Sequence, residues 1–200
     1  MAKEPIDFWF SIGSMYTYLS VMRLPEVAAN AGVTFRWRPF SVRAIMIEMD
    51  NRPLSKPLKL AYMWRDIERR AQTHGISYRA QPTYPLKNFD LANRIAVVGN
   101  EEGWCQDYTR AAYKRWFVDH DEAGSDSSNR ASLREIGQDA ERVVARASSE
   151  EIGARYDAGT NEARKLGIFG APTFVVGKEL FWGDDRLEDA VAWHRKTGGA

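Results

Sequence analysis

The chain has 200 residues, of which 44% are hydrophobic and 12% aromatic, enough to close one hydrophobic core. Lys and Arg number 28 and Asp and Glu 27, so the formal net charge is only +1. Proteins that bind nucleic acid or anionic lipid need a basic excess, so we expect neither partner. Cys105 is the single cysteine, which excludes an internal disulfide, a CxxC redox pair and a zinc site built on several thiolates.

No segment predicts export or membrane insertion. The apolar runs are a few residues long, as at residues 174–176, whereas crossing a bilayer takes about 20 residues. The first ten residues carry Lys3 and Glu4 and lack a signal-peptide pattern. We therefore expect a cytoplasmic protein without a membrane partner.

The first forty residues predict a strand, a helix and a second strand. Residues 6–12 are dense in aromatic and aliphatic side chains, and a helical pattern from residue 15 to about 30 is closed by Gly32. Residues 33–40 alternate as a strand does. Such a unit is usually parallel and right-handed.

The middle of the chain predicts only helices. Residues 56–147 show helical periodicity without a convincing strand, and the turn-rich stretches 81–85, 99–103 and 121–130 predict loops. The end predicts a helix, a hairpin and a helix. These are a helix from near residue 148 to Gly167, strands at 173–176 and 179–182, and a helix over 185–196.

Joined together, these elements predict an α/β fold: a thioredoxin-like mixed sheet with an all-helical insertion. Residues 1–50 and 148–200 would form the thioredoxin-like domain, and residues 51–147 the helical insertion domain. In this order the end of the first strand, the start of the next helix and the loop before the third strand converge. We therefore expect the chemistry at that point.

Ser14 lies at the predicted strand-to-helix turn. Free backbone N–H groups and the positive end of the helix dipole favour an anion there, including a thiolate. Serine is also a common N-cap residue, and an ordinary capping role for Ser14 is a second interpretation compatible with the first.

Pro172 directly precedes the predicted third strand. Most bonds before proline are trans, and such a proline often only marks the start of a strand. A cis bond would instead turn the backbone N–H and C=O of Ala171 toward the Ser14 turn, where an extended peptide could pair with them. The thioredoxin-like order favours the cis bond.

Five segments, taken in chain order, carry a resemblance to a known family. They are residues 8–14 (FWFSIGS) with Tyr18, residues 51–53 (NRP), 59–62 (KLAY), 170–174 (GAPTF) and 181–187 (FWGDDRL). In these segments the chain is similar to the 2-hydroxychromene-2-carboxylate isomerase family, which is related to kappa-class glutathione transferases within the DsbA-like thioredoxin superfamily. The match extends over nearly the whole chain, and its last two segments are the most specific.

The resemblance implies a glutathione site around Ser14. Ser14 matches the family serine that replaces a redox cysteine and hydrogen-bonds the glutathione sulfur, which favours the thiolate. Ala171, held before Pro172, matches the residue whose backbone pairs with the cysteinyl part of glutathione.

The resemblance also implies which residues bind the two ends of glutathione. Asn51 and Lys59 match positions that hold the glycyl end, where an ammonium suits a carboxylate. Asp184 and Asp185 match the turn that binds the γ-glutamyl end, where a carboxylate suits an ammonium. Taken singly, each residue also has an ordinary structural interpretation. Asn51 fits a turn, Lys59 a solvated helix face, and Asp184 and Asp185 the cap and first turn of the last helix.

The sequence departs from the family pattern next to Ser14. The family commonly has Ser-Pro followed by Ser-Tyr, whereas here Ser14 precedes residues 15–18 (MYTY), and Ser11 stands near a position that is often acidic. The glutathione site is therefore matched more closely than the substrate pocket. Tyr62, Trp64 and Tyr84, with Trp104, are candidates for an aromatic substrate pocket, and core packing is the alternative for each.

We expect a glutathione-dependent isomerase acting on a small aromatic or unsaturated keto acid by thiolate addition, bond rotation and elimination. The alternatives are a kappa-type transferase or peroxidase, in which the thiolate is consumed, and a glutathione-binding protein without catalysis. The relatives suggest a homodimer. No metal is expected, because the histidines lack ligand spacing; they are His74, His120 and His194.

Overall fold

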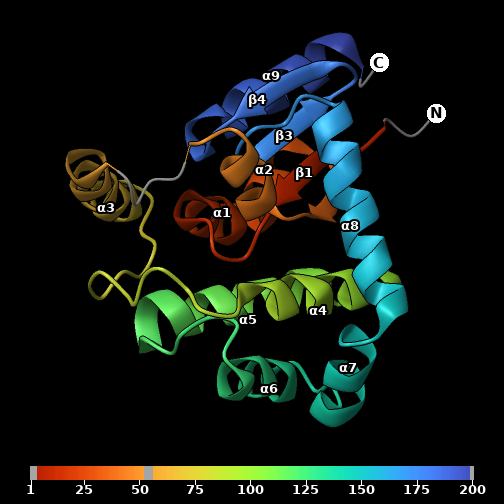
Figure 1. The fold of residues 1–200 in the computed structure, drawn as a ribbon. Helices are drawn as coiled ribbons and strands as arrows, with labels where there is room; N and C mark the ends of the chain where they lie inside the picture. The colour runs from red at the N-terminus through yellow and green to blue at the C-terminus, as the bar shows by residue number, and fades with distance from the viewer. Residues whose placement is uncertain (1–3, 52–55, 199–200) are drawn as a thin grey trace.

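The structure, a computed structural model, describes residues 4–51 and 56–198 (Figure 1). The elements in chain order are β1 (Ile6–Phe10), α1 (Met15–Ala31), β2 (Phe35–Pro39), α2 (Val42–Glu48), α3 (Pro57–Thr73), α4 (Phe89–Glu102), α5 (Cys105–Lys114), the π-helical turn η2 (Arg115–Asp119), α6 (Asp126–Glu135), α7 (Ala140–Ala147), α8 (Glu150–Lys165), β3 (Thr173–Val176), β4 (Glu179–Trp182), the 3-10 turn η3 (Asp184–Arg186) and α9 (Leu187–Thr197).

In the described part of the chain, four strands form one mixed sheet in the order β2-β1-β3-β4. β1 and β2 are parallel, with Phe8 opposite Trp37, and β3 is antiparallel to β1, with Phe8 opposite Phe174. β4 is antiparallel to β3. The sheet confirms the predicted strand-helix-strand opening, the terminal hairpin and the thioredoxin-like fold.

Side chains that alternate along the central strands give each face of the sheet its apolar residues. Phe8, Phe10 and Phe174 lie on one face and pack into the large core shared with α1, α4, α5 and α9; the Phe8 and Phe174 rings lie 5.3 Å apart. Trp9 and Val175 lie on the other face and pack against α2 and α8. Both faces of the sheet are therefore buried at β1 and β3, whereas the edge strand β4 is partly exposed.

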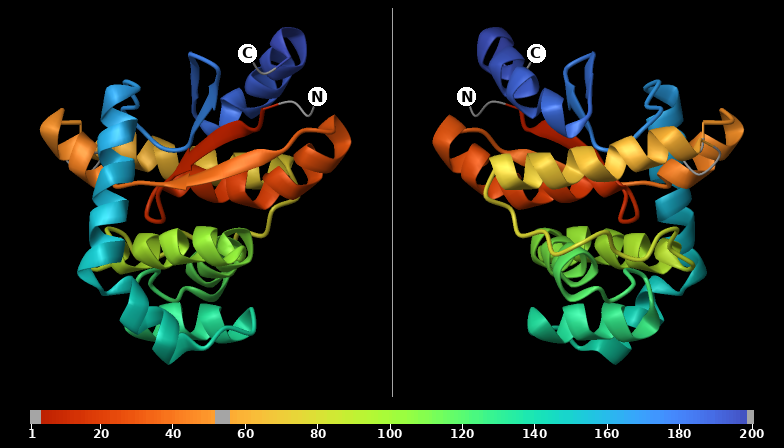
Figure 2. Two further views of the ribbon diagram at one scale, coloured as in Figure 1. Left: turned by 90° about the vertical axis from the view of Figure 1, so that its right-hand side faces the viewer. Right: turned by 90° about the vertical axis from the view of Figure 1, so that its left-hand side faces the viewer.

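The helical insertion lies to one side of the sheet. Figures 1 and 2 show α4 to α7 stacked beyond α1, with α8 running back along the edge of the molecule to the sheet. Helix α4 packs against β2 and α8, and α5 packs against α1. The hydrophobic core spans the insertion and the sheet, so the division into two domains at residues 51 and 147 stays a prediction.

Two parts of the predicted secondary structure were wrong. The stretch 121–130 is not all loop, because Ser125 caps α6 by accepting a hydrogen bond from the Ser128 N–H. The buried side of α6 is largely made of small polar residues, among them Asn129 and Ser132, so hydrophobic periodicity did not indicate a helix. Helix α2 was also missed; it is only 7 residues long.

Two helix boundaries also differ from the prediction. Gly99 lies inside α4 rather than in a turn: a Cβ there would meet the Trp104 ring at 2.8 Å, so this glycine permits close packing. Helix α8, expected from near residue 148, is capped by Ser149, whose side chain accepts from the Ile152 N–H. Within residues 4–51 and 56–198, no helix is long and apolar enough to cross a membrane.

Candidate active site

The candidate site begins where β1 leaves the sheet. The chain turns through residues 11–14 into α1, and the Ser14 N–H donates to the Ser11 carbonyl at 3.0 Å. Gly13 has φ of +118°, a backbone conformation that other residues rarely adopt. The turn thus places Ser14 at the N-cap position of α1.

The Ser14 hydroxyl does not cap the helix. It makes no side-chain capping bond and instead donates to the Ala171 carbonyl at 2.6 Å, across 157 residues of sequence. The Ala171–Pro172 peptide bond is cis, as predicted. Ser14 and the backbone of Ala171 therefore face each other.

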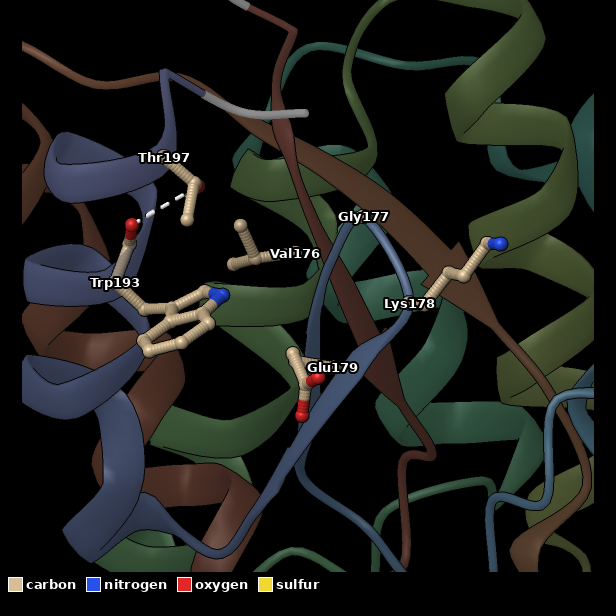
Figure 3. A pocket seen from close by; sticks show the side chains of 6 residues that line it. All are labelled: Val176, Gly177, Lys178, Glu179, Trp193 and Thr197. Atoms are coloured by element: carbon tan, nitrogen blue, oxygen red, sulfur yellow. Dashed lines mark hydrogen bonds between the residues drawn. The ribbon is translucent and has the colours of Figure 1, made fainter.

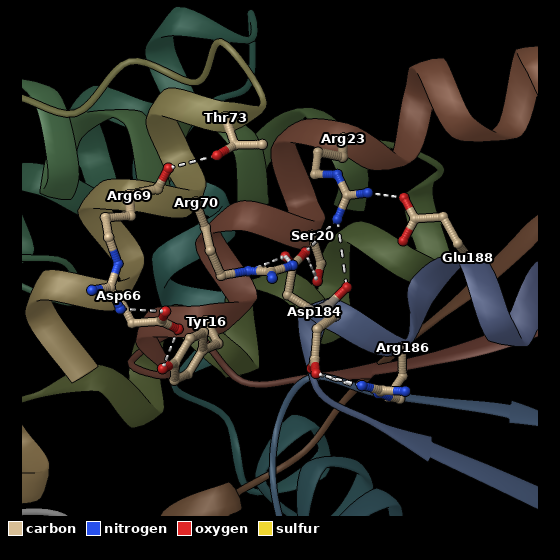
Figure 4. Close-up of polar contacts among 11 residues, drawn as sticks. Tyr16, Ser20, Arg23, Asp66, Arg69, Arg70, Thr73, Asp184, Arg186 and Glu188 are labelled. Atoms are coloured by element: carbon tan, nitrogen blue, oxygen red, sulfur yellow. Dashed lines mark hydrogen bonds and ion pairs between the residues drawn. The ribbon is translucent and has the colours of Figure 1, made fainter. Parts of the chain in front are cut away.

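The loop after β4 joins this site through Pro172. The Gly183 N–H donates to the Pro172 carbonyl at 2.9 Å, which places Asp184 and Asp185 next to the cis-proline loop. Figure 4 shows Asp184 between α1 and α3. The structure thus brings together three of the segments that the resemblance singled out.

The two aspartates have different environments. The Asp184 side chain is 0% exposed, its Oδ1 lies 3.1 Å from Arg23, and its Oδ2 lies 2.6 Å from Arg70. Ser20 also donates to Oδ1, at 2.9 Å. Both carboxylate oxygens of Asp184 are therefore engaged within the protein. Asp185 is half exposed and pairs with the neighbouring Arg186 at 2.9 Å.

Tyr16, next to the site, makes a contact that the sequence did not predict. Its hydroxyl donates to Asp66 of α3 at 2.9 Å (Figure 4). Burial, with the Asp66 carboxylate, holds the pKa of Tyr16 above its usual range, so this hydroxyl stays protonated at neutral pH. The contact fixes the first turn of α1 against α3.

Asn51 and Lys59 lie on either side of residues 52–55. Asn51 is half-buried, and its backbone N–H donates to the Met46 carbonyl at 2.9 Å. Lys59 is exposed on α3. Arg52 and Pro53, which belong to one of the resembling segments, lie outside the described residues.

The candidate aromatic residues do not share one environment. Trp64 is buried, and its ring meets that of the half-buried Tyr84 edge-to-face, with centroids 5.7 Å apart. Tyr62 is 61% exposed, beneath the Arg69 guanidinium. Trp104 packs against Tyr108 in the helical insertion.

A shallow pocket lies elsewhere on the sheet. It has a volume of about 470 Å³ and surrounds the β3–β4 turn and the end of α9 (Figure 3). Val176, which lines it, is at the opposite end of β3 from Pro172. This pocket is therefore not part of the Ser14 site.

Comparison with known proteins gives the family. The DSBA-like thioredoxin domain matches residues 5–192. The chain belongs to the DsbA-like thioredoxin family. The predicted resemblance within that family is also confirmed. The chain is 26% identical to the 2-hydroxychromene-2-carboxylate isomerase of Sphingobium xenophagum, covering 92% of this chain and 95% of that protein.

Two further comparisons, one with a protein sequence and one with a solved structure, give related proteins. The chain is 27% identical to glutathione S-transferase kappa 1 of Caenorhabditis elegans, covering 94% of this chain and 89% of that protein. A solved structure of a 2-hydroxychromene-2-carboxylate isomerase superposes with a TM-score of 0.84 at 25% identity, covering 97% of this chain and 96% of that one.

Cys105 does not take part in the site of this DsbA-like chain. It is buried at the start of α5, with its Sγ 3.9 Å from the Thr109 hydroxyl, and burial raises its pKa to about 12. The hydroxyl of Tyr113, also in α5, reaches the Ser14 turn. Cys105 lies eight residues before Tyr113, a separation of about 12 Å along the helix. Among residues 4–51 and 56–198, no cluster of three potential metal ligands occurs.

Proposed function

We propose that this protein is a glutathione-dependent isomerase of a small aromatic or unsaturated keto acid of the 2-hydroxychromene-2-carboxylate type. The observation that carries the proposal is the Ser14 hydroxyl, 2.6 Å from the Ala171 carbonyl across the cis-proline loop, at the start of α1. Relatives named as 2-hydroxychromene-2-carboxylate isomerases, which match over most of the chain, support it.

The residues around Ser14 fit a thiolate. The first turn of α1 contains no acidic side chain, so nothing in that turn cancels the positive end of the helix dipole. The Ser14 hydroxyl is only partly buried. On ligand binding its proton would turn from Ala171 to the sulfur, and the Ala171 carbonyl would then accept an N–H from the bound peptide.

The two ends of glutathione would meet residues of opposite charge. The exposed Lys59 ammonium suits the glycyl carboxylate, with Asn51 nearby in sequence. At the γ-glutamyl end, the half-exposed Asp185 is the better partner for an ammonium group, since Asp184 already binds Arg23 and Arg70. Asp184 would act by holding this turn in place.

The chemistry requires a nucleophile that is returned. Bound glutathione would supply a thiolate that adds to an electrophilic carbon of the substrate, allows rotation about the resulting single bond and is then eliminated unchanged. This chain would hold the thiolate with Ser14 and the start of α1. The exposed Tyr62 and the half-buried Tyr84, which packs on the buried Trp64, would provide aromatic surfaces for the substrate.

A kappa-type transferase or peroxidase is the second candidate, supported by the relatives named kappa-class glutathione transferases. It would use the same Ser14 site and consume glutathione. The changed residues after Ser14 are the only support for a binding protein without catalysis. The homodimer and the cytoplasmic location remain predictions.

Glutathione is expected to raise the melting temperature in a concentration-dependent way, because it would bind only the folded state. At 100 times its dissociation constant, the stabilisation would be about 2.7 kcal/mol. Lys59→Ala is expected to weaken binding, whereas Lys178→Ala, which removes an exposed lysine at the far end of β3, should not. Thermal melts with and without glutathione measure both effects, and the absence of any shift at millimolar glutathione would contradict the proposal.

A further inference from the structure

Two side chains of the helical insertion reach the turn that carries Ser14. From α4, Asn93 accepts a hydrogen bond from the Ile12 N–H at 2.7 Å and donates to the Ile12 carbonyl at 3.0 Å. From α5, the Tyr113 hydroxyl lies 2.9 Å from the Ser11 carbonyl and 2.9 Å from the Ser14 carbonyl. The turn is thus bound by a bidentate amide and by a hydroxyl shared between two acceptors.

The sheet does not hold this turn. The pairing of β1 with β2 ends at Phe10, and its pairing with β3 ends at Trp9. Beyond Phe10 the chain passes through Gly13, the residue with the fewest backbone restrictions, before α1 begins. The position of Ser14 therefore depends on α1, whose first turn Tyr16 ties to α3, and on what binds residues 11–14 from outside the sheet.

The two Asn93 contacts and the contact of Tyr113 with Ser11 are buried, so water does not replace them. Ser11, Ile12, Asn93 and Tyr113 are each 0% exposed. A buried backbone group that loses its partner carries the full cost of its desolvation. Burial also holds the pKa of Tyr113 above its usual range, so its hydroxyl keeps the proton that it donates.

We infer that Asn93 and Tyr113 are positioning residues that hold the Ser14 hydroxyl in register with the Ala171 carbonyl. The helical insertion is then a support for the nucleophile site as well as a cover for the sheet. Helices α4 and α5 lie directly beneath α1 in Figure 1, and α5 packs against α1. The effect on the bound thiol rests on the proposed function, whereas the effect on the turn does not.

Tyr113→Phe and Tyr108→Phe form a matched pair. Both tyrosines are in α5, both are 0% exposed, and each hydroxyl makes a buried hydrogen bond. The Tyr108 hydroxyl donates to Asn129 at 3.0 Å, away from the turn. Similar losses of thermal stability are expected from both changes, and only Tyr113→Phe should alter the turn.

The first measurement is amide hydrogen exchange in the protein without glutathione. In Tyr113→Phe the Ser14 amide, which donates to the Ser11 carbonyl, is expected to exchange several-fold faster, and in Tyr108→Phe at the wild-type rate. Asn93→Ala is expected to speed exchange of the Ile12 amide about tenfold, the factor for one lost hydrogen bond. Asn129→Ala, which removes another buried amide, is its control. Wild-type exchange at both amides would overturn the inference.

The second measurement is the pH profile of glutathione-dependent turnover. With Ser14 displaced, Tyr113→Phe is expected to lower turnover at neutral pH about fivefold, and the deficit should close at high pH, where the thiolate forms without help. Tyr108→Phe should keep the wild-type profile. Coincident profiles for both variants would reduce Tyr113 to a structural role. If the wild type neither binds glutathione nor turns over substrate, the proposed function fails. The amide exchange result still decides whether Asn93 and Tyr113 position the Ser14 turn.

Discussion

Replacing Asp184 with asparagine is expected to lower the free energy of unfolding by about 3 kcal/mol, because it leaves two arginines near the core without their shared counter-charge. Arg23 is only 9% exposed, and Arg70 is 26% exposed. Glu188 also pairs with Arg23 but is 60% exposed, so it offsets only part of the loss. The change would also loosen α3 from α1 and from the loop after β4.

The matched control is Asp185→Asn. Asp185 is 50% exposed and pairs with an equally exposed arginine, so its removal should change stability far less. Urea denaturation at neutral pH measures both variants through the midpoint and slope. Glutathione binding should show the opposite order of effects per folded molecule, with Asp185→Asn the weaker binder. Equal stability losses for the two variants would contradict the assignment of Asp184 to a buried ion-pair network.

Ser14→Ala is expected to raise the pKa of the bound glutathione thiol toward the free-thiol value. A donor to the charged form lowers a pKa, so its removal raises it, and less thiolate is present near neutral pH. A rise of one unit corresponds to about a tenfold fall in turnover at pH values below both pKa values, and the fall disappears as the pH rises past them. The start of α1 still favours the anion, so the loss should be partial.

Ser149→Ala is the control for stability. Ser149 caps α8 through a bond to the Ile152 N–H, and its removal should cost about 1 kcal/mol. Ser14→Ala also removes one hydrogen bond, to Ala171, so a comparable stability loss is expected. Only Ser14→Ala should move the ultraviolet titration of the bound thiol. Superimposable titration curves for wild type and Ser14→Ala would leave the helix backbone as the only activator.

The sheet and its flanking helices were predictable because their signals are local. The dense aromatic run of β1, the alternation of β2, Gly32 at the end of α1 and Pro172 before β3 each act within a few residues. The placement of Ser14 opposite Ala171 followed from the order of these elements. Helix α6 did not follow, because its buried side consists mostly of small polar residues that resemble a loop.

The support of the site was not predictable from local patterns. Asn93 reaches Ile12 across 81 residues, and Tyr113 reaches Ser14 across 99. Neither residue differs in its local sequence from an ordinary core position of a helix. The burial of Asp184 was missed for the same reason, since Arg23 and Arg70 come from two distant helices. Charged residues before a helix resemble a cap when their partners are unknown.

The most direct test of the proposed function follows 2-hydroxychromene-2-carboxylate by absorbance with the wild-type protein, with and without glutathione. We expect rapid isomerisation only when glutathione is present, with the total amount of glutathione unchanged at equilibrium. Consumption of glutathione would instead indicate the kappa-type reaction. Equal rates with and without glutathione, or no isomerisation by protein that has bound it, would contradict the account.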